Sequence, residues 1–209
     1  SDSTLARLHY NIRVDSNDNL DYDVAKIESQ IIKATTLWKD SLKKILLDFY
    51  GEEPGLMLYR KYSHSFPAGY KEHNEATIAV NDIKHFEQIS ATTPMILNLY
   101  SSNDNNSGHF DFKIYQLNNP VPLSDVMPIL ENMGMRVMGE NPYEIRIDKE
   151  TVIWINDFHM TFSGDEPIRL STVKEKFQQV FAKVWLSQLE NTRYNKLALL
   201  ASFDWQQIM

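Results

Sequence analysis

Two carboxylate–histidine pairs have residue types and spacings that could support acid–base chemistry. Asp157 and His159 lie two residues apart in a strand-like segment, and His73 and Glu75 lie at the predicted start of a helix. A carboxylate can hold a neighbouring imidazole in the orientation that a general base needs. Residues two apart on a strand share one face, here the polar one, so we interpret Asp157 and His159 as a solvent-exposed pair. The second pair is typical of helix capping, and we predict no catalytic residue in this chain.

Other common reaction centres need sequence signatures that this chain lacks. It contains no Cys, which excludes disulfides, thiolate zinc ligands and cysteine nucleophiles. Its 7 Gly are scattered and form neither a dinucleotide-binding loop nor a P-loop. None of the 6 His belongs to an H-E-x-x-H motif. The sequence therefore predicts no cofactor-binding residue and no metal site within the chain.

The net charge of the chain and its hydropathy pattern limit the classes of partner that it can bind. The formal net charge is -7, the opposite of the Lys and Arg surplus that nucleic-acid binding requires. No apolar run approaches the roughly 20 residues of a membrane span, and the first residues do not form a signal peptide. The composition, 43% hydrophobic and 23% charged, is typical of a globular protein. We expect a soluble, cytoplasmic chain with no nucleic-acid or membrane partner.

The predicted secondary structure, which must position these side chains, differs between the first, middle and last parts of the chain. Residues 8–15 alternate like a single strand, and no second strand follows it closely. A long amphipathic helix is predicted from Asp21 or Asp23 to Gly51, a span of roughly 40 Å at 1.5 Å per residue. Its apolar residues recur every three or four positions: Val24, Ile27, Ile31, Ala34, Trp38, Leu42, Ile45 and Phe49. Shorter helices are predicted up to residue 93.

The middle of the chain combines strands with one helix. Alternating or short apolar runs predict strands at 95–100, 110–115, 135–138, 143–147 and 151–163. Apolar residues at helical spacing predict a helix over 123–133, with Gly134 as its stop. The last part, 165–209, is predicted to be helical, with a final helix that runs to Met209. These patterns indicate an α+β fold, a small antiparallel sheet flanked by long amphipathic helices.

Five short stretches, in order along the chain, carry a resemblance to a known family. They are Val24, Ile27, Glu28, Ile31 and Thr36-Leu37-Trp38 with Asp40; the Phe-Pro run of 65–72; 79–83; 122–137 with Glu140, Pro142 and Tyr143; and 194–197 with Ala201 and Trp205. Together they resemble an internal segment of the large bacterial NAD-specific glutamate dehydrogenases. The last stretch departs from the family pattern, because Thr192-Arg193 stands where Asp-Gly is usual.

The resemblance implies a division of the chain and a role for it. Residues 1–20 would be the remnant of one ACT-like module, 21–93 a helical linker, 94–164 a second, ferredoxin-like-related ACT module and 165–209 a C-terminal helical region. Only one helix lies within 94–164, so this module is either degenerate or uses a flanking helix. The parent enzyme would oxidatively deaminate L-glutamate to 2-oxoglutarate with NAD, whereas this segment would bind no cofactor and be inactive alone.

Three functions remain open from the sequence. The first is a regulatory and assembly segment of a homo-oligomeric enzyme that contacts the catalytic domain of the same chain. An amino-acid effector would then bind free N–H groups at Leu123, Ser124 and Asp125, where the alternative is helix capping by Ser124. The second is a purely structural oligomerisation module in which the long helix is a strut. The third is an unrelated enzyme that uses Asp157 and His159.

Overall fold

Four consecutive helices open the part of the chain that the structure, a computed structural model, describes. Those residues are 37–101, 109–162, 170–201 and 203–208, and all the helices and strands below belong to the unit Trp38–Met209. The helices are α2 (Trp38–Tyr50), α3 (Glu52–Tyr62), α4 (Ala68–His73) and α5 (Ala76–Phe86). The predicted long helix is confirmed over α2, and its start, like the strand predicted at 8–15, lies outside the described residues.

Two glycines shape the junction between α2 and α3. Gly51 has a φ of 86°, a left-handed conformation that glycine adopts at little cost, and its N–H donates to the Leu47 carbonyl to end α2. At Gly55, an added Cβ would lie 2.6 Å from the backbone oxygen of Leu46. The two helices can therefore approach this closely only because residue 55 has no side chain.

The sheet has four strands, each antiparallel to its neighbours. They are β1 (Met95–Tyr100), β2 (His109–Leu117), β3 (Met135–Arg146) and β4 (Val152–Phe162), and their spatial order is β1-β2-β4-β3. The strands at 95–100, 110–115 and 151–163 are thus found where the sequence predicts them. The α+β fold class is confirmed.

One strand prediction is wrong. The sequence predicts two strands at 135–138 and 143–147, but β3 runs without interruption from Met135 to Arg146, with a register irregularity between Val137 and Gly139. Pro142 does not break β3, because β3 is an edge strand of the sheet that the described residues form, and prolines are tolerated in edge strands.

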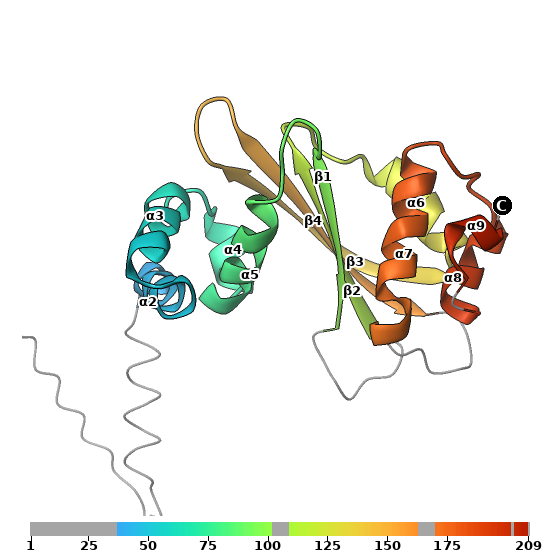
Figure 1. Cartoon of the computed structure of the whole chain (residues 1–209), viewed down its shortest axis with the longest axis horizontal. Coiled ribbons are helices and arrows are strands. Elements are labelled where there is room, and N and C mark those ends of the chain that lie inside the picture. The colour runs from blue at the N-terminus through green and yellow to red at the C-terminus, as the bar shows by residue number, and fades with distance from the viewer. Residues whose placement is uncertain (1–36, 102–108, 163–169, 202, 209) are drawn as a thin grey trace, which may run out of the picture. The chain divides into compact units, whose positions relative to one another are not determined.

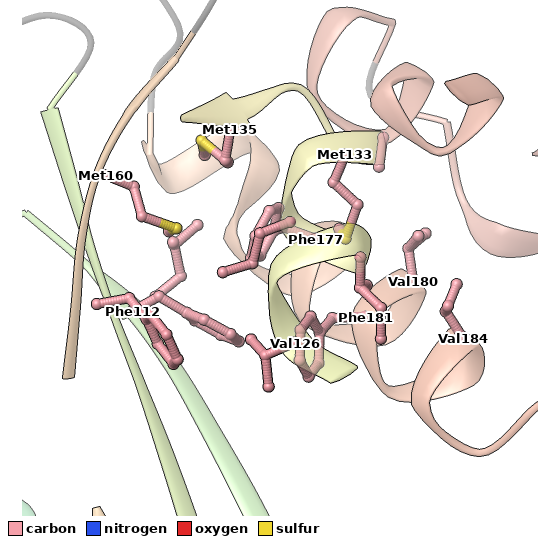
Figure 2. Packing of buried hydrophobic residues seen from close by; sticks show 14 of the residues in the cluster. Phe112, Val126, Met133, Met135, Met160, Phe177, Val180, Phe181 and Val184 are labelled. Atoms are coloured by element: carbon pink, nitrogen blue, oxygen red, sulfur yellow. The ribbon is translucent and has the colours of Figure 1, made fainter. Parts of the chain in front are cut away.

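Helices α6 (Leu123–Asn132) and α7 (Leu170–Trp185) cover one face of the sheet (Figure 1). Gly134, with a φ of 84°, follows α6 as predicted. Phe112 of β2 packs edge-on against Phe177 and Phe181 of α7, with ring centroids 5.3 and 5.0 Å apart (Figure 2). Because α7 begins after residue 164, the sheet module does use a flanking helix.

The opposite face of the sheet packs against the helices that precede it. Tyr115, Ile153 and Ile155 of the sheet share a second hydrophobic core with residues of α2 to α5. The T-shaped contact between Tyr70 of α4 and Tyr143 of β3, with centroids 5.1 Å apart, is part of it. Both faces of the sheet are therefore buried.

The C-terminal region is more broken than predicted. A 3-10 turn (Arg193–Lys196) is followed by α8 (Leu197–Leu200) and α9 (Trp205–Ile208) in place of one continuous helix. Ala198 and Leu199 are buried in the core that α6 and α7 form. No helix in the described ranges is both long and apolar enough to span a bilayer.

Candidate functional site

A cluster of charged and phenolic side chains lies between α5 and the sheet. Strand register creates half of it, because Lys113 of β2 lies directly opposite Asp157 of β4, and Asp111 lies opposite His159. Lys113, Asp157 and Asp82 of α5 are 1%, 4% and 2% exposed. Charged groups are seldom buried this deeply unless they are paired.

Asp82 is the centre of this buried cluster. Its two carboxylate oxygens accept hydrogen bonds from Lys113 Nζ at 3.1 and 2.9 Å. The hydroxyl of Tyr70, from α4, donates to Asp82 Oδ2 at 2.5 Å, and that of Tyr115, from β2, donates to Oδ1 at 2.8 Å. Four hydrogen bonds from three residues, one on α4 and two on β2, thus satisfy one buried carboxylate.

Burial keeps the phenols of this cluster in their neutral, donating form. Burial first, and the nearby Asp82 carboxylate second, raise the pKa of Tyr70 and that of Tyr115 well above the usual range. A phenolate beside Asp82 would place two negative charges side by side in an interior with little water. Both hydroxyls therefore stay protonated and donate to Asp82 at neutral pH.

Asp157 is the second carboxylate of the cluster, and burial affects its pKa more than the nearby charges do. Its Oδ2 lies 3.8 Å from Lys113 Nζ, and Tyr100 donates to both of its oxygens at 3.1 and 3.2 Å. Burial raises the pKa of Asp157 to about 6, although Lys113 and His159 act in the opposite direction. Lys113 is already bound to Asp82, so its attraction does not offset the desolvation of a second carboxylate.

His159 makes a separate chain of hydrogen bonds at the edge of the cluster. Its Nδ1 lies 2.6 Å from Asp111 Oδ1 and its Nε2 lies 2.9 Å from Asn141 Nδ2. Since an ionised carboxylate only accepts hydrogen bonds, the imidazole donates from Nδ1 to Asp111. The carboxylate that orients His159 is therefore Asp111.

The prediction of a solvent-exposed Asp157 and His159 pair is wrong in part. The side chain of His159 is 47% exposed, but Asp157 is buried. The polar face of β4 is covered because α5 packs over it, a contact that the local sequence pattern does not show. The arrangement holds two separate carboxylate networks and does not join Asp157 to His159 as a catalytic pair.

The other predicted site residues lie apart from the cluster. His73 Nδ1 lies 3.4 Å from the Tyr143 hydroxyl, and Glu75 stands at the N-cap of α5 without a side-chain capping bond. Leu123, Ser124 and Asp125 are exposed at the start of α6.

At that helix start, two groups already have partners. The Asp125 N–H donates to the Pro122 carbonyl at 3.1 Å, and the Ser124 hydroxyl donates to Asp125 Oδ1 at 3.1 Å. Ser124 is thus not the side-chain cap of α6, whose N-cap is Pro122.

Sequence reasoning missed Asp82 and Lys113, the two best-paired charges of the cluster. A signal was present, because Asp82 occupies the apolar stripe of α5, three residues after Ala79 and four before Phe86. A charge in such a stripe requires a buried partner. Among the residues that the structure describes, no group of three His, Asp or Glu side chains is placed to hold a metal ion.

Three family models match consecutive parts of the chain. They describe the glutamate dehydrogenase ACT2 domain (residues 1–39), helical motif 2 (residues 45–89) and the ACT3 domain (residues 94–173). The chain belongs to the NAD-specific glutamate dehydrogenase family. The buried cluster of Asp82, Lys113 and Asp157 therefore joins the part matched as helical motif 2 to the part matched as ACT3.

Curated relatives match the whole chain but only a small share of their own length. The chain is 32% identical over 208 residues to the NAD-specific glutamate dehydrogenase of Pseudomonas aeruginosa and 30% identical to that of Halomonas elongata. It covers 13% of each of these proteins. The enzyme of the same name from Mycobacterium tuberculosis is 25% identical over 154 residues. The chain thus corresponds to an internal segment of these relatives.

Proposed function

We propose that this chain is a non-catalytic regulatory and assembly segment of an NAD-dependent glutamate dehydrogenase. The observation that carries the proposal is the buried cluster of Asp82, Lys113 and Asp157. It ties α5 to β2 and β4 by charge pairing that tolerates little displacement, since a buried charge that loses its partner is strongly destabilising. A movement of the helices is therefore transmitted to the sheet, and a movement of the sheet to the helices.

The wider setting of the segment is part of the same proposal. The parent enzyme would deaminate L-glutamate with NAD as the hydride acceptor, in the cytoplasm, as a homo-oligomer. Its catalytic domain would lie elsewhere in the same chain and bind the NAD. Support comes from the names of the relatives and from the small share of their length that this chain covers.

A replacement experiment in the Pseudomonas aeruginosa relative tests this proposal. Deleting the segment that this chain matches should change the assembly state, seen by light scattering, or the response of NAD reduction to amino acids. Inserting this chain in its place should restore both. A deletion that leaves assembly and regulation unchanged would overturn the proposal, and so would glutamate-dependent NAD reduction by the 209-residue chain alone.

The site predicted at Leu123, Ser124 and Asp125 remains a proposal for effector binding. The N–H groups of Leu123 and Ser124 at the start of α6 could donate to the carboxylate of an amino acid, with the Asp125 N–H already bonded to the Pro122 carbonyl. Calorimetric titration of an amino-acid panel into the chain and into an Asp125→Lys variant tests it. Added positive charge at residue 125 should strengthen binding of a carboxylate there, and an unchanged affinity would place the ligand elsewhere.

A purely structural oligomerisation module is the second candidate function. Leu186, Tyr194, Leu200 and Phe203 are all exposed, with exposed fractions of 59%, 71%, 49% and 36%. All four belong to the last part of the chain, 186–203, and an exposed apolar patch is typical of a protein interface. Sedimentation of the chain and of a Leu186→Ser, Leu200→Ser variant distinguishes the two functions. Loss of self-association without any effector response in the parent enzyme would favour the structural module.

A further inference from the structure

A cavity of about 310 Å³ opens beside the buried cluster. Lys84 and His85 of α5, Asn98 and Tyr100 of β1, Lys113 of β2 and Lys174 of α7 are among its walls. Its volume is at the lower end of the range for small-molecule sites and equals roughly ten water molecules at about 30 Å³ each. The cavity is therefore large enough for a small metabolite.

The charge of this cavity is opposite to that of the chain. The whole chain has 21 Lys and Arg against 28 Asp and Glu, yet the cavity walls hold three lysines and one carboxylate, Asp82. Asp82 binds Lys113 through both oxygens and so neutralises it. Lys84 and Lys174 then have no carboxylate to pair with among the described residues that line the cavity.

Lys174 is the lysine of the cavity on which the effect of burial is clearest. The ammonium group is half-buried, and its recorded hydrogen bond is to a neutral amide oxygen, Asn98 Oδ1, at 2.8 Å. Burial lowers the pKa of Lys174, and within the described part of the chain burial is the one influence on it. A bound anion would supply the missing counter-charge.

His85 adds a neutral polar wall between the two lysines. Its Nδ1 donates to the Asn81 carbonyl at 2.8 Å, and its ring stacks on Tyr115 at 4.9 Å. Burial is the largest influence and lowers the pKa of His85. The hydrogen bond to the Asn81 carbonyl and the Asp82 carboxylate act to raise it, and the charges of Lys174 and Lys84 lower it further. The ring is therefore neutral, and both ammonium groups lie near it.

We propose that this cavity binds a small dicarboxylate whose two charges pair with Lys84 and Lys174. A dianion neutralises both lysines at once, and the side-chain NH2 of Asn98, whose oxygen accepts from Lys174, can donate to its oxygens. The volume favours an organic dicarboxylate over inorganic phosphate, which would fill little of the cavity. This inference rests on the proposed regulatory function and assigns the chemical class of the effector.

Calorimetric titration of glutarate into the 209-residue chain tests the assignment. We expect one site per chain, and we expect Lys84→Met and Lys174→Met each to weaken the affinity at least tenfold. Lys44→Met removes an exposed lysine of α2 and is the matched control, which should bind as the unmodified chain does. Circular dichroism and thermal unfolding verify that each variant is folded.

Parallel titrations with acetate and phosphate identify the class of anion that the cavity binds. Acetate, with one charge, should bind at least tenfold more weakly than glutarate. Absence of glutarate binding, equal affinity in the folded Lys84→Met and Lys174→Met variants, or tighter binding of phosphate than of glutarate would overturn the assignment. These outcomes leave the segment replacement in the parent enzyme unaffected, so a failure here is distinct from a failure of the proposed function.

Discussion

The two faces of the sheet are both buried, but different interactions hold the helices against them. On the face toward α6 and α7, Phe112 belongs to a cluster of buried apolar side chains. On the face toward α5, the next residue along β2, Lys113, is equally buried and bound to Asp82. One strand therefore presents a hydrophobic core on one side and an ion pair on the other.

The two faces differ more in how precisely they fix the position of a packed helix than in how strongly they hold it. Hydrophobic burial is non-directional, so a helix can slide over an apolar face at modest cost. A buried ion pair permits far fewer arrangements, because each displaced charge is left without a partner. We infer that the ion pair on the sheet face toward α5 fixes the position of that helix, in addition to the apolar burial that both faces share.

Replacing Lys113 by Met tests the ion-pair face and should have the largest effect. Asp82 would keep its two tyrosine donors but lose its only cation, and the expected loss of unfolding free energy is about 3–5 kcal/mol at pH 7. Urea titration measures it, with Lys44→Met as an exposed control that should change stability by less than about 0.5 kcal/mol. A loss below about 1 kcal/mol would show that the pair does not stabilise the docking of α5.

Phe112→Ala is the comparison on the opposite face. Truncating a buried phenylalanine costs about 3–5 kcal/mol by loss of apolar contacts, whatever the pH. The cost of Lys113→Met should instead shrink between pH 7 and pH 4.5, because the carboxylates left without a cation can take up protons. Equal pH profiles for the two variants would contradict the distinction between the faces.

Asp157→Asn tests the pH dependence of the buried cluster. The folded pKa of about 6 lies above the unfolded value of about 3.9, so the folded state holds the proton more tightly. This contribution is complete below about pH 4 and is lost as the pH rises through 6, by at most about 3 kcal/mol. Asn retains an acceptor for Tyr100 but cannot ionise, so its unfolding free energy should lack this decline.

Urea titrations of both proteins from pH 4 to pH 7 measure this difference. The stability of Asp157→Asn relative to the unmodified chain should increase with pH. Asp48→Asn, at an exposed position of α2, is the control. A constant difference between the two proteins over this range would rule out titration of Asp157 in the folded state.

The apolar face could be predicted from the sequence because its signal is local. Phe110, Phe112 and Ile114 alternate along β2, and the helix before Gly134 has its apolar residues at helical spacing. The continuity of β3 through Pro142 could not be predicted in the same way. It depends on β3 being an edge strand, which is a property of the whole sheet.

The ion-pair face could not be predicted because burial there is decided by a distant helix. Lys113 and Asp157 look like ordinary solvent-facing residues until α5 is placed over them. Asp82 was the residue that could have revealed this, since its position in the apolar stripe of α5 demands a cationic or hydroxyl partner. Pattern alone would still leave that partner unidentified among the 21 Lys and Arg of the chain.

Tyr70→Phe should give the smallest of these effects and tests whether α4 belongs to the same network. The change removes one hydroxyl that donates to Asp82 at 2.5 Å and keeps the ring against Tyr143. A hydrogen bond to a charged group contributes about 1.5–3 kcal/mol, and the lower value is expected because three donor contacts to Asp82 remain. Tyr194→Phe, which removes an exposed hydroxyl, is the matched control for urea titration. In a Lys113→Met background the cost of Tyr70→Phe should rise, because Asp82 then depends on its phenolic donors alone. An additive double variant would instead mean that α4 is held by ring packing and not by the carboxylate.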